Sequence, residues 1–252
     1  MQFLRNDMTD LILGMGEVGE TIYNLLLERG FSCVGKDIDS TKCKNFSTEE
    51  KISEIECLHI CLPGEIKDFV EISIKQIEEI DKIEFVIVHS TVRPGTTKII
   101  QEKSKTPIIY SPVRGVHKRF LEDIKKYTKF FASDKENLDE KIIDMMKKRF
   151  EKIQLMSSFK TAELAKILVD TTYYGWLINY AQITKMICDK EGIDFDEMWK
   201  FADEIHENLG NRPKMYPGII GGHCVIPNLN LIENSDLEII RKINKMLSES
   251  KK

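Results

Sequence analysis

The chain has 252 residues, 42% of them hydrophobic and 31% charged, with a formal net charge of −4. This is the balance of an ordinary globular protein, and the length allows a substantial buried core. A mildly acidic chain has no electrostatic basis for binding nucleic acid or an anionic membrane surface, and no apolar run approaches the ~18 residues that span a bilayer. We therefore expect neither a nucleic-acid nor a membrane partner.

In the first ~155 residues, short apolar strands alternate with amphipathic helices. The patterns predict strands at 10–13, 32–35, 55–62, 83–89 and 107–110, and helices at 17–29, 65–80 and 96–103. Such alternation is typical of a parallel sheet with helices on both faces. We expect an α/β fold, with a Rossmann-type doubly wound dinucleotide-binding domain over residues 1–155.

From residue 156 to 252 the pattern is helical only. It predicts a long helix over 160–191, a second over 195–209, a Gly/Pro-rich loop over 210–228 and a charged amphipathic helix over 234–252. Aromatic residues line the long helix and are interpreted as core or as a dimer interface: Tyr173, Tyr174, Trp176 and Tyr180. We expect a smaller helical domain for dimerisation and substrate binding, and a homodimer, because an uncovered apolar strip would be an exposed patch.

The six cysteines have neither disulfide-framework spacing nor a CxxC pair. The N-terminal stretch also lacks the apolar segment of a signal peptide, so we expect a reduced, cytoplasmic setting. Cys57 and Cys61 flank His59 in a predicted strand, and a metal site there is one alternative. Buried structural thiols are favoured, because free cysteine behaves as a small hydrophobe. We expect no metal.

A glycine fingerprint follows the first predicted strand and opens the first helix: Gly14, Met15, Gly16, Glu17, Val18 and Gly19. In this context GxGxxG predicts a pyrophosphate site at a helix N-terminus. Asp37, at the end of the next strand, would accept hydrogen bonds from a ribose 2′-OH and repel a 2′-phosphate, which favours NAD over NADP, although Lys36 beside it tempers the preference. Pro63, Ser90 and Thr91 follow later strands and are expected at the same sheet edge. S-adenosylmethionine also binds Rossmann-like sheets and remains open.

The chain resembles the UDP-glucose/GDP-mannose (nucleotide-sugar) dehydrogenase family. Six segments carry the resemblance in order: GMGEVG, DID, STVRPGTT, SPVR, AELAK and GGHCVIPN. The resemblance implies a Rossmann domain, a long dimerisation helix and a second Rossmann-like domain that holds the substrate nucleotide. Family members oxidise a primary alcohol to a carboxylate with two NAD molecules, and a cysteine traps the intermediate aldehyde.

By this resemblance, Cys224 is the nucleophile, Lys166 stabilises a developing oxyanion, and Thr91 lies near the nicotinamide and a catalytic water. Two site residues are exchanged. The family usually has Asn where this chain has Asp170, and Asp where it has Asn228. If the two side chains share one site, the exchange keeps one acid and one amide, with Asp170 as the possible base.

Two further departures concern the substrate. The SPER glutamate of the family is Val113 here, and about 24 residues follow Asn228, so we expect a shortened form without the nucleotide-sugar domain. Arg114, His117, Lys118 and His223 are the candidate substrate contacts, with a charged surface loop as the alternative for the basic residues.

We expect an NAD-dependent oxidoreductase acting on a primary or secondary alcohol of a small, polar, sugar-like and anionic substrate. The wider superfamily includes β-hydroxyacid dehydrogenases, which use a lysine on the same helix. A group-transfer enzyme that uses S-adenosylmethionine and a cofactor-binding module without catalysis are the alternatives.

Overall fold

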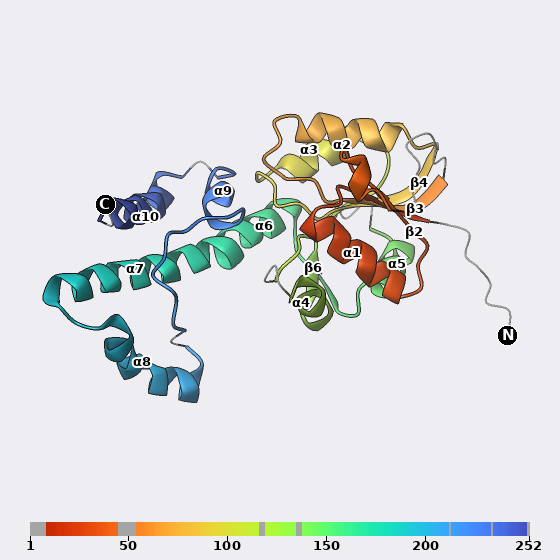
Figure 1. Ribbon diagram of the computed structural model, residues 1–252. Coiled ribbons are helices and arrows are strands. Elements are labelled where there is room, and N and C mark those ends of the chain that lie inside the picture. Colours follow the sequence, from red (N-terminus) through yellow and green to blue (C-terminus); the bar gives the residue numbers. More distant parts are fainter. Residues whose placement is uncertain are drawn as a thin grey trace. The chain divides into compact units, whose positions relative to one another are not determined.

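A computed structural model describes residues 9–44, 54–115, 119–134, 138–211, 213–232 and 234–250. The chain divides into two compact units, Met1–Lys166 and Ile167–Lys252 (Figure 1). The division falls after Lys166, whereas the sequence places it near residue 155. The reason is helix α6 (Phe159–Leu164), because its Phe159 and Ala162 pack into the core of the first unit.

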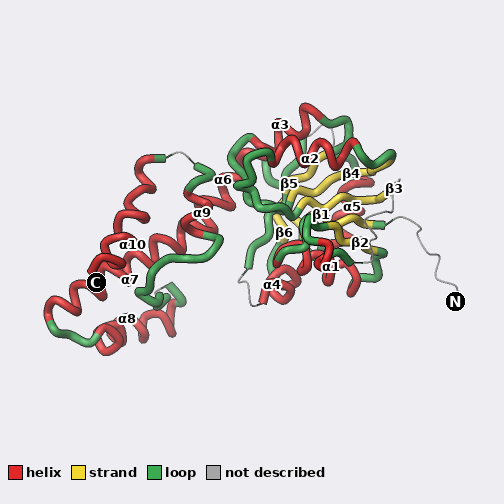
Figure 2. Tube along the Cα trace, turned by 45° about the horizontal axis from the view of Figure 1, so that its top comes forward, coloured by secondary structure: helices red, strands yellow, loops and turns green. Residues whose placement is uncertain are grey.

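A five-stranded parallel sheet with the order β2-β1-β3-β4-β5 forms the centre of the first unit (Figure 2). Its strands are β1 (Asp10–Leu13), β2 (Cys33–Lys36), β3 (Glu54–Ile60), β4 (Lys82–Val88) and β5 (Ile108–Tyr110). The chain runs from β1 outward to β2 and then returns to β3 on the other side of β1. This reversal is the switch point at which open α/β sheets bind their ligands. The predicted α/β class is confirmed.

Helices cover both faces of this sheet (Figure 2). One face packs against α1 (Glu17–Glu28), α4 (Phe120–Lys126) and α5 (Glu140–Arg149), the other against α2 (Phe69–Glu78), α3 (Thr96–Lys103) and α6. Helix α2 begins later than the predicted residue 65, after turns that bond Ile66 to Pro63 and Phe69 to Ile66. Strands β6 (Lys129–Phe131) and β7 (Ile153–Leu155) pair in parallel beside β5, a part that the sequence patterns leave unassigned.

The second unit is helical. The predicted helix over 160–191 is continuous but changes type: after α6 it is a π-helix over Ala165–Thr172, then α7 (Tyr173–Glu191). Helix α8 (Phe195–Leu209) follows, and α10 (Glu238–Ser250) ends the described chain. The predicted loop over 210–228 contains the start of a short helix, α9 (Val225–Leu229). None of the helices in the described ranges is long and apolar enough to cross a membrane.

The aromatic residues of α7 face solvent in the single chain. Tyr173 is 52% exposed, Tyr180 64% and Trp176 43%, so the interpretation of these side chains as core is wrong. The buried residues of α7 are small or carry amides instead: Gly175, Asn179, Ala181, Gln182 and Cys188. Gly175 lies against Val225 and Ile240, where an added Cβ would come within 2.8 Å of the Val225 side chain.

Candidate functional site

The glycine loop has the close-packed form that a pyrophosphate site requires. Gly14 has φ = +90°, which favours glycine, and a Cβ on Gly19 would lie 1.8 Å from the carbonyl oxygen of Gly14. Gly16 precedes the first turn of α1, is exposed, and would have nothing within 4 Å of an added Cβ. Open space therefore lies at the N-terminus of a 12-residue helix, a position that favours a phosphate group.

Asp37 lies beside this loop. Its Oδ2 accepts a hydrogen bond from the Met15 backbone N–H at 2.6 Å, and its Oδ1 accepts one from the Asp39 N–H at 2.9 Å. A carboxylate has about four acceptor positions, so both oxygens can accept further hydrogen bonds from a ribose diol. The Lys36 ammonium is directed away from this carboxylate, because it bonds Gln76 of α2 at 2.7 Å and pairs with Glu79, the residue after α2, at 3.6 Å.

The loops after β3 and β4 meet at the same edge of the sheet. Ser90 Oγ donates a hydrogen bond to the Leu62 carbonyl at 2.5 Å, next to the exposed Pro63. A Cβ on Gly64 would lie 1.7 Å from the Thr91 carbonyl oxygen, so only glycine allows this approach. Gly64 thereby fixes the position of Thr91, which is half-buried. Sequence reasoning missed this role of Gly64, although a Pro-Gly pair that follows a buried strand could have indicated it.

Glu163, in the AELAK segment, is a second residue that sequence reasoning missed. Its side chain is fully buried, and it accepts hydrogen bonds from Gly95 N–H at 2.6 Å, Thr97 N–H at 3.0 Å and Thr97 Oγ1 at 2.7 Å. These donors form the N-terminus of α3, where a carboxylate is favourable. Glu163 therefore fixes the STVRPGTT loop to α6, three residues before Lys166, which is half-buried.

Arg114 contacts the protein itself. Its Nη2 donates to the Thr128 carbonyl at 2.7 Å, and its guanidinium lies 4.8 Å from the centre of the Phe130 ring. Val113 is buried in the core beside it. Two other predicted substrate contacts of this segment, His117 and Lys118, lie outside the described residues.

The remaining candidates belong to the second unit. Cys224 precedes α9 and is half-buried, His223 is exposed, and Asp170 is half-buried in the π-helix. Asn228 is buried and donates from Nδ2 to the hydroxyl of Thr171 at 3.0 Å. The amide therefore bonds the residue next to Asp170.

Two amide side chains hold the loop before Cys224. Asn244 of α10 accepts from the Ile220 N–H at 2.7 Å and donates to the Ile220 carbonyl at 3.1 Å. Gln182 of α7 donates to the Gly218 carbonyl at 2.7 Å and to the Asn244 side chain at 3.1 Å. The segment leading to the cysteine is thus bonded to both helices.

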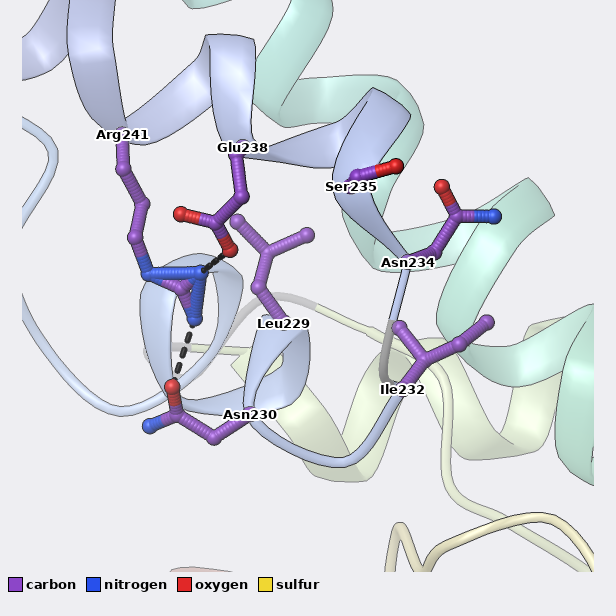
Figure 3. Close-up of a pocket in the computed structure, with 7 residues that line it drawn as sticks. All are labelled: Leu229, Asn230, Ile232, Asn234, Ser235, Glu238 and Arg241. Carbon is purple, nitrogen blue, oxygen red and sulfur yellow. Dashed lines mark hydrogen bonds and ion pairs between the residues drawn. The ribbon is translucent and has the colours of Figure 1, made fainter.

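A cavity of about 500 Å³ lies between the end of α9 and the start of α10 (Figure 3). The guanidinium of Arg241 lines this cavity and donates hydrogen bonds to Glu238 at 2.6 Å and to Asn230 at 2.5 Å. The Glu238 carboxylate therefore balances its charge.

The thiols predicted to be structural are buried. Cys57 and Cys61 lie in the core face against α1, while His59 bonds Asp10 and His89. In the described part of the chain, no group of three or more His, Cys, Asp or Glu side chains is placed to hold a metal ion.

No protein-family model matches the chain. A UDP-N-acetyl-D-mannosamine dehydrogenase of Methanocaldococcus jannaschii is 26% identical in a gapped alignment of 259 positions, which covers 85% of this chain and 58% of that protein. The chain therefore spans little more than half the length of this relative.

Solved structures share the fold. The UDP-D-ManNAc dehydrogenase of Pyrococcus horikoshii has a TM-score of 0.75 and 19% identity, covering 95% of this chain and 69% of that one. The UDP-glucose dehydrogenase of Pyrobaculum islandicum has a TM-score of 0.72 and 17% identity, covering 99% of this chain and 70% of that one. The resemblance to nucleotide-sugar dehydrogenases is confirmed.

Proposed function

We propose that the chain binds NAD and acts as an NAD-dependent oxidoreductase on an alcohol of a polar, sugar-like substrate. The observation that carries this is the glycine loop: Gly19 packs against Gly14, Gly16 leaves open space at the N-terminus of α1, and the Asp37 carboxylate bonds the loop. The similarity to nucleotide-sugar dehydrogenases supports the reaction type.

Thermal shifts with NAD, NADP and S-adenosylmethionine in parallel test the cofactor. NAD should stabilise the protein most, because the Asp37 carboxylate would repel a 2′-phosphate. Asp37→Ala should remove much of the preference for NAD. An equal or larger shift with NADP in the parent protein would contradict the assignment, and a shift only with S-adenosylmethionine would favour group transfer.

Gly16→Ala tests the pyrophosphate position without disturbing the fold. Gly16 has φ = −74° and open space around it, so alanine is tolerated there, while its methyl group would occupy the space for the phosphate. We expect an unchanged melting temperature without ligand and a loss of about tenfold or more in NAD affinity. Asn24→Ala, on the exposed side of α1, is the matched control and should change neither.

We propose catalytic roles for Cys224, Lys166 and Thr91 as the family resemblance implies. NAD would supply the hydride acceptor. Lys166 would stabilise the oxygen of the substrate as the alcohol loses its proton, and Cys224 would add to the resulting aldehyde. Appearance of NADH with UDP-linked amino sugars or hexoses, and its loss in Cys224→Ser and Lys166→Met, tests these roles.

Asp170 and Asn228 are proposed to serve one site. The bond from Asn228 to Thr171, next to Asp170, supports this placement. Asp170→Asn leaves two amides and no acid, and adding Asn228→Asp restores a carboxylate. The double variant should therefore keep more activity than the product of the single variants, by about 0.5–3 kcal/mol of coupling. Strict additivity would refute the shared site.

A homodimer formed on α7 is also proposed, in a reduced compartment such as the cytoplasm. Its support is the exposure of Tyr173, Trp176 and Tyr180, because large exposed apolar faces mark interaction surfaces. All six cysteines are free, as a reducing compartment requires. Light scattering at micromolar concentration should give twice the 29.2 kDa chain mass, and Tyr180→Glu should lower it to the monomer value.

A further inference from the structure

A chain of buried polar groups crosses the first unit beneath the loops of the proposed active site. The rings of His59 on β3 and His89 after β4 lie edge to edge with their planes 2° apart, and His59 Nδ1 lies 3.0 Å from His89 Nε2. His59 Nε2 lies 3.2 Å from Asp10 Oδ2 at one end. At the other end, Lys129 Nζ lies 3.3 Å from His89 Nδ1. All four residues are at most 5% exposed, so water does not satisfy their hydrogen bonds.

The contacts of Asp10 decide which atom of His59 donates a hydrogen bond to it. Arg149 donates to both Asp10 oxygens, from Nε at 2.8 Å and from Nη2 at 2.6 Å, so Asp10 is an ionised acceptor. His59 must therefore carry a proton on Nε2 to bond Asp10. Its Nδ1 then either accepts from His89 or, if protonated, donates to it.

The Lys129 end has three acceptors. Its Nζ lies 2.6 Å from the Ser111 carbonyl and 2.9 Å from the Pro112 carbonyl, in addition to His89 Nδ1. An ammonium has three N–H donors and a neutral amine has two. With both rings neutral, His89 Nδ1 is an acceptor, so only an ammonium satisfies all three contacts. In this arrangement every N–H has an acceptor, although His89 Nδ1 and the Ser111 carbonyl, 3.0 Å apart, are then both acceptors of Lys129.

A second arrangement also gives every N–H an acceptor. If His59 is an imidazolium, it donates to Asp10 and to His89 Nε2, and His89 Nδ1 donates to the Ser111 carbonyl, which lies 3.0 Å away. Lys129 is then a neutral amine that donates to the Ser111 and Pro112 carbonyls. If Lys129 and His59 were both charged, an N–H of the Lys129 ammonium would face the N–H of His89. If both were neutral, one of the three acceptors around Lys129 would receive no hydrogen bond.

The two complete arrangements differ by one displacement. Lys129 Nζ gives a proton to His89 Nδ1, and His89 Nε2 gives its proton to His59 Nδ1. No bond other than N–H changes, and one positive charge moves from Lys129 to His59. In both arrangements this charge, with Arg149, balances Asp10 and Glu56, whose Oε2 bonds Arg149 at 2.5 Å.

We propose that Lys129, His89 and His59 hold one shared proton, and that Lys129 is a positioning residue for the proposed active site. Lys129 bonds the carbonyls of Ser111 and Pro112, which begin the SPVR segment, and His89 directly precedes Ser90 and Thr91. The position of the proton sets the charge beside Lys166. This last step rests on the proposed function.

The surroundings are consistent with a mobile proton. Burial lowers the pKa of Lys129 and of His89 well below their usual values, and it lowers that of His59 against the opposing effect of Asp10. Like charge on Lys166 and Arg114 adds to the effect at Lys129. The titratable and charged groups that act on His59, His89 and Lys129 are Asp10, Cys61, Arg114, Arg149 and Lys166.

Nitrogen-15 NMR of the imidazole rings across the neutral pH range tests the proposal on the intact protein, with His59→Gln and His89→Gln for assignment. We expect both rings to follow the same titration curve with a common midpoint, because the apparent pKa values of coupled groups belong to the set of groups and not to one ring. Lys129→Met should raise that midpoint by about one pH unit or more, because it removes a like charge. The exposed Lys126→Met is the matched control and should leave it unchanged.

Two independent midpoints, or a midpoint that Lys129→Met does not move, would overturn the shared proton. The wild-type titration needs no variant. If Lys129→Met does not fold, Lys129→Arg replaces it: the guanidinium keeps the charge but cannot give up a proton, so both rings should stay neutral at the pH where the wild type shares the proton, and a wild-type titration curve in this variant would also overturn the proposal. In the enzyme assay, Lys129→Met should displace the pH profile of kcat while leaving KM within about twofold. If no substrate gives turnover, the proposed function fails while the NMR result stands.

Discussion

Replacing Glu163 by glutamine tests whether one buried carboxylate holds the STVRPGTT loop. The amide keeps the shape of the side chain but places an NH₂ group against either the Gly95 N–H, now bonded at 2.6 Å, or the Thr97 donors. One charge-assisted hydrogen bond is lost, a buried N–H is left without an acceptor, and the remaining bonds lose their charge. The free energy of unfolding should fall by about 2 to 4 kcal/mol.

Urea denaturation followed by circular dichroism measures this change, and hydrogen exchange locates it. The amides of Gly95 and Thr97 should lose protection in Glu163→Gln. The matched control is Glu102→Gln at the other end of α3, where the carboxylate is 61% exposed and lies 3.7 Å from Lys98; it should cost less than about 0.5 kcal/mol. If the two variants are equally stable, the reasoning about Glu163 is wrong.

Three further outcomes are expected. Gly64→Ala should lower the melting temperature and displace Thr91, because its Cβ would lie 1.7 Å from the Thr91 carbonyl oxygen; an unchanged melting temperature would contradict this. Burial raises the pKa of Asp10, but His59 and Arg149 hold it below its usual value of 3.8, so its contribution to stability is present above that pH and is lost as the pH falls through the folded pKa. Arg149→Met should therefore cost about 3 to 5 kcal/mol at neutral pH in denaturant unfolding, and the loss should shrink toward pH ~4, where Asp10 can be protonated. Iodoacetamide should modify the two half-buried thiols, Cys43 and Cys224, before the others, since burial raises the pKa of Cys33 and Cys61 to about 12. Mass spectrometry that finds Cys33 or Cys61 modified first would contradict this expectation.

Sequence patterns predicted the five-stranded sheet because glycine and proline mark the ends of its strands. The glycine fingerprint and Asp37 were also readable, since all of their geometry lies within one βαβ unit. The helix at α6 was also predicted, but the unit that it joins was not readable from the sequence. Its apolar residues continue the helical pattern of the second unit, but they pack into the core of the first, and periodicity does not reveal which core a helix joins.

The residues that were missed have partners far away in the chain. Glu163 bonds Gly95, 68 positions away, and Lys129 contacts His89, 40 positions away. A single sequence shows the residue types but not these pairings. The exchange of Asp170 and Asn228 was visible only because the family resemblance supplied the expected residue at each position.

The amide contacts between Gln182, Asn244 and the loop at Gly218–Ile220 have a consequence for evolution. Each amide fills the hydrogen bonds of the other as well as those of the backbone, so a change in one leaves a buried polar group unpaired. Substitutions at the two positions should therefore occur together, and an alignment of close homologues should show them as a covarying pair. In a homologue without both amides, we expect the cysteine loop to be free to adopt another conformation.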